Sequence, residues 1–170
     1  MKPNIFLLLI DSLREDKFRK FCETHPNSNF KNLMENGIYF SQSISQADAT
    51  LLSLSSIFTG LFPFKTGIRS EKFNKMRSGV NTFFKNLKKS GYNFYGYYPT
   101  VVDLTNILPQ FQNDDSGKFS SPCITKDIDK KIVKLLDNLN SSWFVYLHCM
   151  DLHDPIHIPK KFDDKKIKTT

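Results

Sequence analysis

Three polar side chains, far apart in the chain, are of the types that carry out ester chemistry. Asp11 directly follows an apolar run, Thr50 precedes a helical hydrophobic stripe, and His153 follows a later apolar run. A carboxylate can hold a divalent cation, and such a cation lowers the pKa of a nearby hydroxyl. A histidine can bind an anionic oxygen or protonate a leaving group. Together, these residue types indicate metal-assisted attack on a phosphate or sulfate ester.

Each of these residues also has an ordinary structural interpretation. Thr and Asp are common helix and turn caps, so Thr50 and Asp11 can serve as caps, and His153 can be a surface residue. On that interpretation the chain is an unrelated α/β domain. The order and spacing of the surrounding elements must decide between the two.

The stretch from Ala49 to Gly67 predicts a helix that presents its own first residues. Four residues recur at helical spacing and are expected to form one stripe that faces a core: Leu51, Leu54, Phe58 and Leu61. We expect Thr50 to be the N-cap of this helix and Gly60 to end it in a left-handed conformation. The free amides of the first turn attract a bound anion.

Three apolar runs predict buried strands, at residues 4–10, 92–98 and 143–148, with a brief extra strand at 38–40. Helices are expected between them, at 18–23, 29–35, 80–90 and from 125 to 139, whereas 101–121 is expected to be an irregular excursion. This alternation predicts a three-layer α/β/α sandwich with a mainly parallel sheet, one edge of which is exposed. Ligands bind at the carboxyl ends of such strands, so Asp11, Thr50 and His153 should meet there.

Composition limits the other possible functions. The 170 residues fit one domain, and the net charge of +7 is concentrated in a terminal run of lysines. No nucleic-acid-binding motif is present, so no nucleic-acid partner is expected. The three cysteines form no spaced pair, and we see neither a signal peptide nor a transmembrane segment. These features predict a cytoplasmic location.

Several segments, in the same order along the chain, resemble the sulfatase and alkaline phosphatase superfamily. They are the first strand and turn at 3–16, the helix and strand at 30–40, the T-G-x-x-P and G-[IV] motifs at 59–63 and 67–68, the K-K-S-G-Y segment at 88–92, and the segment from Tyr146 to Pro155. In this family the nucleophile lies ten residues before the glycine of the T-G-x-x-P motif. Counting back from Gly60 gives Thr50.

The resemblance implies a role for each candidate residue. Asp11 matches a metal ligand of the family, Thr50 matches the catalytic nucleophile, which also contacts the metal, and His153 matches a histidine that lies near the substrate. It implies an anionic ester substrate and a divalent metal ion, with Ca²⁺, Mg²⁺, Mn²⁺ and Zn²⁺ all open. It also implies a partial N-terminal catalytic domain over residues 1–159, followed at 160–170 by a basic tail or a truncated continuation.

The departures from the family pattern narrow the expected activity. Sulfatases need Cys or Ser as the nucleophile because that residue is oxidised to formylglycine, whereas Thr is the nucleophile of phosphodiesterase and phosphotransferase branches. Ser12 replaces a second Asp, and Tyr97 and Tyr98 stand where sulfatases often carry Gly-Lys.

No segment resembles the family's downstream Asp-His-Gly metal-binding motif. We therefore expect either an N-terminal segment of a hydrolase or transferase or a truncated homologue. The former would rely on a missing C-terminal half or on a homo-oligomer. The latter would act as a non-catalytic anion-binding or interaction module.

Overall fold

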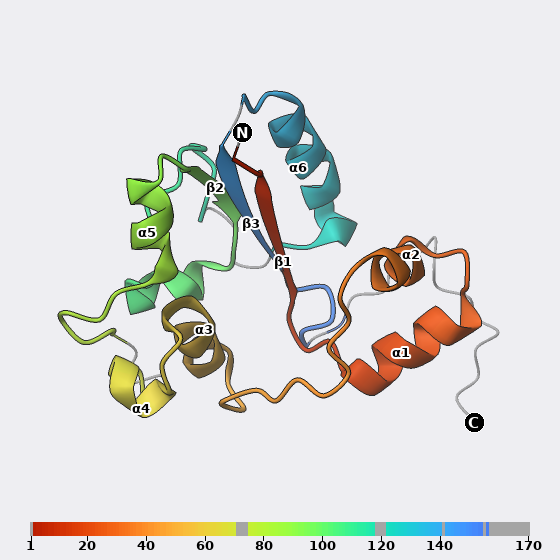
Figure 1. Ribbon diagram of the computed structural model, residues 1–170, viewed down its shortest axis with the longest axis horizontal. Coiled ribbons are helices and arrows are strands. Elements are labelled where there is room, and N and C mark those ends of the chain that lie inside the picture. Colours follow the sequence, from red (N-terminus) through yellow and green to blue (C-terminus); the bar gives the residue numbers. More distant parts are fainter. Residues whose placement is uncertain (1, 71–74, 118–121, 141, 155, 157–170) are drawn as a thin grey trace.

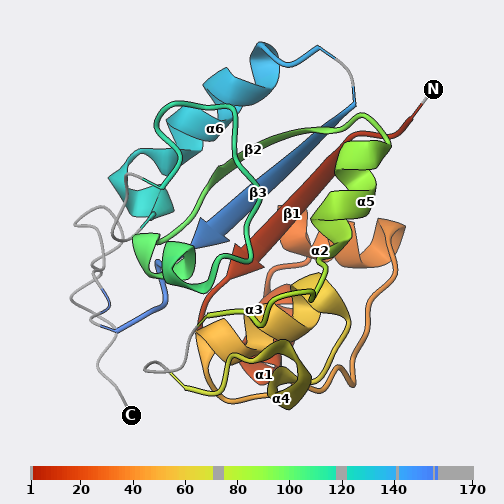
Figure 2. The ribbon, with the colours of Figure 1, turned by 90° about the vertical axis from the view of Figure 1, so that its left-hand side faces the viewer.

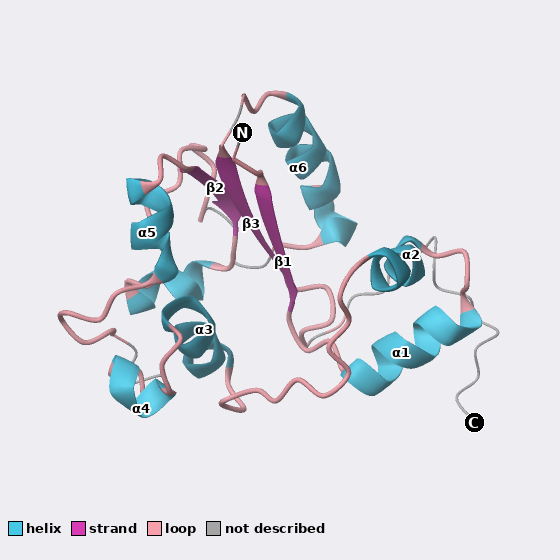
Figure 3. Cartoon of the chain, viewed as in Figure 1, coloured by secondary structure: helices cyan, strands magenta, loops and turns pink. Residues whose placement is uncertain are grey.

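The computed structural model describes residues 2–70, 75–117, 122–140, 142–154 and 156, so the predicted basic tail at 160–170 lies outside the described residues. Groups of helices separate the three described strands along the chain (Figures 1 and 3). In chain order, the elements are β1 (Ile5–Ile10), α1 (Glu15–Thr24), α2 (Asn29–Asn36), α3 (Thr50–Thr59), α4 (Pro63–Thr66), α5 (Phe83–Lys89), β2 (Asn93–Tyr97), the 3₁₀ helices η1 (Thr100–Thr105) and η2 (Ile124–Lys126), α6 (Ile128–Asp137) and β3 (Trp143–Cys149).

The three predicted apolar runs form one parallel sheet in the order β1-β3-β2. β3 is the central strand, and its run of large apolar residues fits a strand that is covered on both faces. Gly96 allows β2 to lie close to β3, because a Cβ at this position would come within 2.6 Å of the Tyr146 carbonyl oxygen. The last of the described strands thus inserts between the first two.

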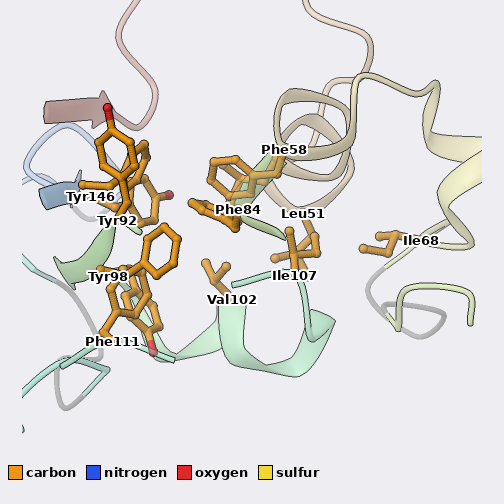
Figure 4. Close-up of a cluster of buried hydrophobic side chains, with 13 residues drawn as sticks. Leu51, Phe58, Ile68, Phe84, Tyr92, Tyr98, Val102, Ile107, Phe111 and Tyr146 are labelled. Carbon is orange, nitrogen blue, oxygen red and sulfur yellow. The ribbon is translucent and has the colours of Figure 1, made fainter. Parts of the chain in front are cut away.

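One face of the sheet is covered by α3, α5 and the segment around η1 (Figure 4). Phe58 of α3 is fully buried, and its ring contacts those of Phe83, Phe84 and Tyr146 at centroid distances of 5.0 to 5.7 Å. Three of the four predicted stripe residues, Leu51, Leu54 and Phe58, belong to this cluster. The fourth, Leu61, follows the end of α3 and is 37% exposed, so the prediction was wrong there. The cluster fixes α3 against the sheet, and with it the first residue of α3.

The opposite face is covered by α6. Ile128 and Ile132 of α6 pack with Val145 and Leu147 of β3 in a second core cluster. Alternate residues of β3 therefore serve the two clusters, as expected for a strand with period-two side chains. The predicted three-layer α/β/α architecture with a parallel sheet is confirmed.

Two further local predictions were wrong. Residues 38–40 form no strand, and Ile38 and Phe40 are largely exposed. Thr50 is not the N-cap of α3; it is the first residue of the helix, and Ala49 occupies the cap position. Gly60 does end α3 in a left-handed conformation, with φ of 70°. The cap prediction failed because the Thr50 hydroxyl bonds a partner outside its own helix, as described below.

β1 is an edge strand of the described sheet, as predicted. Its core-facing residues Ile5, Leu7 and Leu9 pack under the α3 layer, whereas Phe6 and Leu8, on the α6 side, are 41% and 39% exposed. α6 thus covers β2 and β3 more completely than β1. No helix in the described part of the chain has the length and apolar character needed to cross a membrane.

Candidate functional site

The carboxyl end of β1 fixes Asp11. Its backbone N–H donates a hydrogen bond of 2.9 Å to the Cys149 carbonyl, which extends the pairing of β1 with β3 by one residue. Because side chains alternate along a strand, Asp11 points to the same face of the sheet as Leu9. That face is the one on which α3 packs. Figure 2 shows the arrowhead of β1 pointing toward α3.

Thr50 lies at the start of α3 and contacts Asp11. Its hydroxyl donates a hydrogen bond of 3.1 Å to Asp11 Oδ2, across 39 positions of sequence. Ala49, at the N-cap position of α3, offers no side-chain oxygen to the amides of the first turn. The sheet and the helix start together place a carboxylate, a hydroxyl and the positive end of a helix dipole at one point.

A third residue at this point, His148, was not among the predicted site residues. Its Nε2 lies 3.1 Å from Asp11 Oδ2, and its Nδ1 lies 2.9 Å from the hydroxyl of Tyr146. His148 and Tyr146 are both fully buried. Two residues apart on β3, they point to the same face as Asp11, and this makes a continuous polar chain from the core to Thr50.

The hydrogen bond from His148 is the main reason that the pKa of Asp11 is lowered from its ordinary value of 3.8. Burial opposes this shift, and the electrostatic influence of His148 and the hydrogen bond from Thr50 add to it. Asp11 is therefore a carboxylate at neutral pH. Because a carboxylate of low pKa is a weak base, this environment favours a role in binding a cation over one in accepting a proton.

The oxygen atoms of Asp11 and Thr50 are of the type that hard divalent cations bind. Asp11 Oδ1 has one weak contact, with the Ser12 hydroxyl at 3.4 Å, and the Thr50 hydroxyl supplies a second oxygen. Mg²⁺ and Ca²⁺ take about six to eight oxygen ligands. Within the described residues, no group of three or more His, Cys, Asp or Glu side chains is arranged to hold a metal ion.

The predicted substrate residue, His153, is not in direct contact with Asp11 or Thr50. It is exposed, and its Nδ1 lies 2.8 Å from the Asp154 carbonyl. It follows the same strand as His148, and its charge contributes to the lowered pKa of Asp11. His153 is thus near the site without being part of its hydrogen-bond network, and its substrate role stays a prediction.

Other polar residues near the strand ends have structural roles. Asp151 accepts hydrogen bonds of 2.8 and 3.0 Å from the amides of Ile124 and Thr125, so it caps the 3₁₀ helix η2, which precedes α6. Tyr98 is buried on the α3 face, and burial together with the neighbouring Asp103 raises its pKa. Tyr97 faces α6 instead, and burial raises its pKa to about 12. Both tyrosines are therefore uncharged at neutral pH.

A pocket of about 710 Å³ lies on the outer side of α3 and not at Asp11. It is lined by Ser53, Ser56 and Ile57 of α3 and by residues of the loop before the helix. Ser53 lies one helical turn beyond Thr50, so the pocket begins beside the site but does not include it. Cavity size alone would not have identified Asp11 and Thr50.

The role of His148 was not predicted because the residue continues an apolar strand. The family-like segment from Tyr146 to Pro155 contains it, but the resemblance assigned a role only to His153. The available signal was strand alternation, which places residues 146 and 148 on one face. Using this signal requires the register of β3 against β1, in which His148 pairs with Leu9. That register is a tertiary fact, which the local sequence pattern does not contain.

Comparison with known proteins agrees with this architecture. The sequence profile of the family described as Sulfatase matches residues 3–170. A search of curated proteins finds no match. Among solved structures, the chain is similar to a candidate sulfatase from Bacteroides thetaiotaomicron VPI-5482, with a TM-score of 0.64 and 15% sequence identity. The similarity covers 88% of this chain and 35% of that chain, so our chain spans about a third of the length of this neighbour.

The low sequence identity means that the structural neighbour shows a shared fold, while the profile match over nearly the whole sequence shows the family. The sheet order, the two helical layers and the ordered motifs from Asp11 to Pro155 are consistent with both. The chain belongs to the sulfatase family and has its alkaline-phosphatase-like fold.

Proposed function

We propose that this chain carries part of the active site of a metal-dependent hydrolase or transferase that acts on phosphate or sulfate esters, with Thr50 as the nucleophile. The observation that supports this proposal most strongly is the hydrogen bond of 3.1 Å between the Thr50 hydroxyl and Asp11 Oδ2. It joins a candidate nucleophile to a candidate metal ligand at the strand ends where this fold class binds ligands.

Each residue has a defined task in this proposal. Asp11 binds the cation and orients the Thr50 hydroxyl, while the uncapped first turn of α3 offers its amides to the anionic group of the ester. His153, from its exposed turn, approaches the substrate and binds or protonates a departing oxygen. A divalent cation at Asp11, once bound, supplies positive charge that lowers the pKa of the hydroxyl.

The identity of the nucleophile favours phosphate esters. Thr50 is not a precursor of formylglycine, so it attacks through its own hydroxyl oxygen and forms a phosphothreonine intermediate. Asp11 and Thr50 supply too few ligands to hold a cation tightly. We propose that the remaining ligands come from polypeptide outside the described residues or from a second copy of the chain.

This proposal is tested by assaying nitrophenyl esters of phosphate, as monoester and diester, and of sulfate, each with Mg²⁺, Ca²⁺, Mn²⁺ or Zn²⁺. We expect a phosphate ester to be cleaved and the Asp11→Asn variant to lose more than about a hundredfold in kcat/KM. Removing a residue that only hydrogen-bonds to a metal ligand already lowers metal affinity or activity by about tenfold to a hundredfold, and Asp11 is proposed to bind the metal directly.

The matched control for this assay is Asp16→Asn. Asp16 lies five positions after Asp11, and its exposed carboxylate pairs with Arg14. This variant should leave kcat/KM unchanged. Cleavage that survives the Asp11→Asn substitution would overturn the proposed role of Asp11.

A second candidate function is a non-catalytic module that binds anions or a protein partner. It is favoured by the absence, within the described ranges, of any cluster of three metal-ligating side chains. On this alternative, the wild-type chain cleaves none of the esters with any of the four cations, yet inorganic phosphate or sulfate still binds. Isothermal titration of these anions, alongside the ester assay, separates the two functions.

A further inference from the structure

The buried pair formed by Tyr146 and His148 lies directly behind Asp11. Both side chains are fully buried, and both distances in the chain from the Tyr146 hydroxyl through His148 to Asp11 are within hydrogen-bond range, at 2.9 and 3.1 Å. Hydrophobic packing alone would place apolar residues at these positions. A buried polar chain is costly unless every group in it is paired.

The buried hydroxyl of Tyr146 sets the direction of the hydrogen bonds through His148. Burial raises the pKa of the Tyr146 hydroxyl, so this group keeps its proton and needs an acceptor. Among the described residues, its hydrogen-bond partner is His148 Nδ1. With the hydroxyl as donor, Nδ1 is the acceptor, and Nε2 is the ring nitrogen that faces Asp11 as a donor.

The Nε2–H of His148 then donates to Asp11 Oδ2, the same oxygen that accepts from Thr50. Oδ1 is left with the weak contact to Ser12 at 3.4 Å. Two donors on one oxygen fix the plane of the carboxylate and leave the other oxygen available. The two oxygens of Asp11 thus differ in what they can bind.

We propose that Tyr146 and His148 are positioning residues that lock the Asp11 carboxylate, so that Oδ2 holds the Thr50 hydroxyl and Oδ1 faces the cation. The cation part of this proposal rests on the proposed function. The locking of Asp11 does not, because it follows from the hydrogen bonds alone. The two parts can therefore be tested separately.

The locking is tested by nitrogen NMR of the full chain with labelled histidine. In the wild type, we expect the His148 nitrogen shifts to show Nε2 as the hydrogen-bond donor and Nδ1 as the acceptor. In Tyr146→Phe, which keeps the ring and removes the hydroxyl, the nitrogen shifts should move toward a mixture of tautomers. A wild-type His148 that is protonated on Nδ1, or a Tyr146→Phe variant with unchanged shifts, would overturn the proposal.

The matched control for this substitution is Tyr92→Phe. Tyr92 lies in the same core cluster, and its hydroxyl donates to the Pro3 carbonyl at 2.8 Å, so this variant also loses a tyrosine hydrogen bond. It should leave the His148 shifts as they are in the wild type. Equal changes in the two variants would mean a general loosening of the core and would count against a positioning role.

Cation binding is measured on the same proteins by titrating Mn²⁺ and following water proton relaxation. We expect Tyr146→Phe and His148→Leu to weaken Mn²⁺ binding by about 10- to 100-fold, the usual effect of removing a group that orients a metal ligand. His148→Gln should recover most of the affinity, since its amide can still donate to Asp11.

Two outcomes separate failure of this inference from failure of the proposed function. If wild type binds no Mn²⁺ but shows the expected tautomer and its loss in Tyr146→Phe, the cation role of Asp11 is wrong and the locking of its carboxylate stands. If Mn²⁺ binds equally well to the wild type and to His148→Leu, the positioning role is wrong and the proposed function stands.

Discussion

Thr50→Ala is expected to abolish ester cleavage, with a loss of at least about a thousandfold in kcat, because removing a nucleophile takes away the covalent pathway. The fold should survive, because the hydroxyl makes one described hydrogen bond, to Asp11, at the partly exposed start of α3. We expect the free energy of unfolding to fall by about 1 kcal/mol. Steady-state kinetics and urea unfolding of the same preparation measure both quantities.

Thr59→Ala is the matched control. Thr59 is the last residue of the same helix, and its hydroxyl donates to the Ser55 carbonyl at 2.6 Å, far from Asp11. The two variants remove the same atoms from opposite ends of α3, so a loss of turnover confined to Thr50→Ala identifies the hydroxyl beside Asp11. Thr50→Ser, which keeps a hydroxyl, should retain most of the turnover. Equal kcat in wild type and Thr50→Ala would rule out Thr50 as the nucleophile.

Phe58→Ala is expected to have the largest effect on stability. The Phe58 ring lies in the buried cluster of Figure 4, fully buried against Phe83, Phe84 and Tyr146, so truncation leaves a cavity between α3 and the sheet. Substitutions of this kind cost about 3–5 kcal/mol. That is a large fraction of the total stability of a small domain, about 5–15 kcal/mol. The midpoint of urea unfolding should fall accordingly.

A matched substitution is available at Phe64, which is 62% exposed and stacks on Phe62 with ring centroids 5.7 Å apart. Phe64→Ala should change the free energy of unfolding by less than about 0.5 kcal/mol. Similar losses for both variants would show that the Phe58 cluster is not the core that holds α3. Since α3 carries Thr50, the Phe58→Ala variant should also lose turnover at temperatures where it stays folded.

Much of the fold was accessible from the sequence because its strongest patterns are local. The apolar runs of β1 and β3 and the stripe of Leu51, Leu54 and Phe58 each reflect one element packing against one core. The strand order β1-β3-β2 could not be predicted from such local patterns, because β3, the last described strand along the chain, lies in the middle of the sheet. Hydrophobic periodicity does not encode which strands become neighbours.

The candidate site was accessible only in part, for the same physical reason. Asp11 and Thr50 stand at element ends, where residue type and motif spacing carry information, and the structure brings them within hydrogen-bond distance. His148 and Tyr146 stand inside a buried strand, where any residue of suitable size continues the pattern. The cap prediction for Thr50 failed because Asp11, 39 residues away, accepts the hydrogen bond of its hydroxyl.

The central claim is that Thr50 attacks the ester, and a trapped covalent intermediate tests it most directly. The full chain is mixed with the best phosphate ester and its preferred cation, quenched in acid during turnover, digested and analysed by mass spectrometry. We predict one phosphoryl group on the peptide that contains Thr50, located on Thr50 by fragmentation and absent from the Thr50→Ala protein. Turnover with an unmodified Thr50, or with the phosphoryl group on another residue, would contradict the claim.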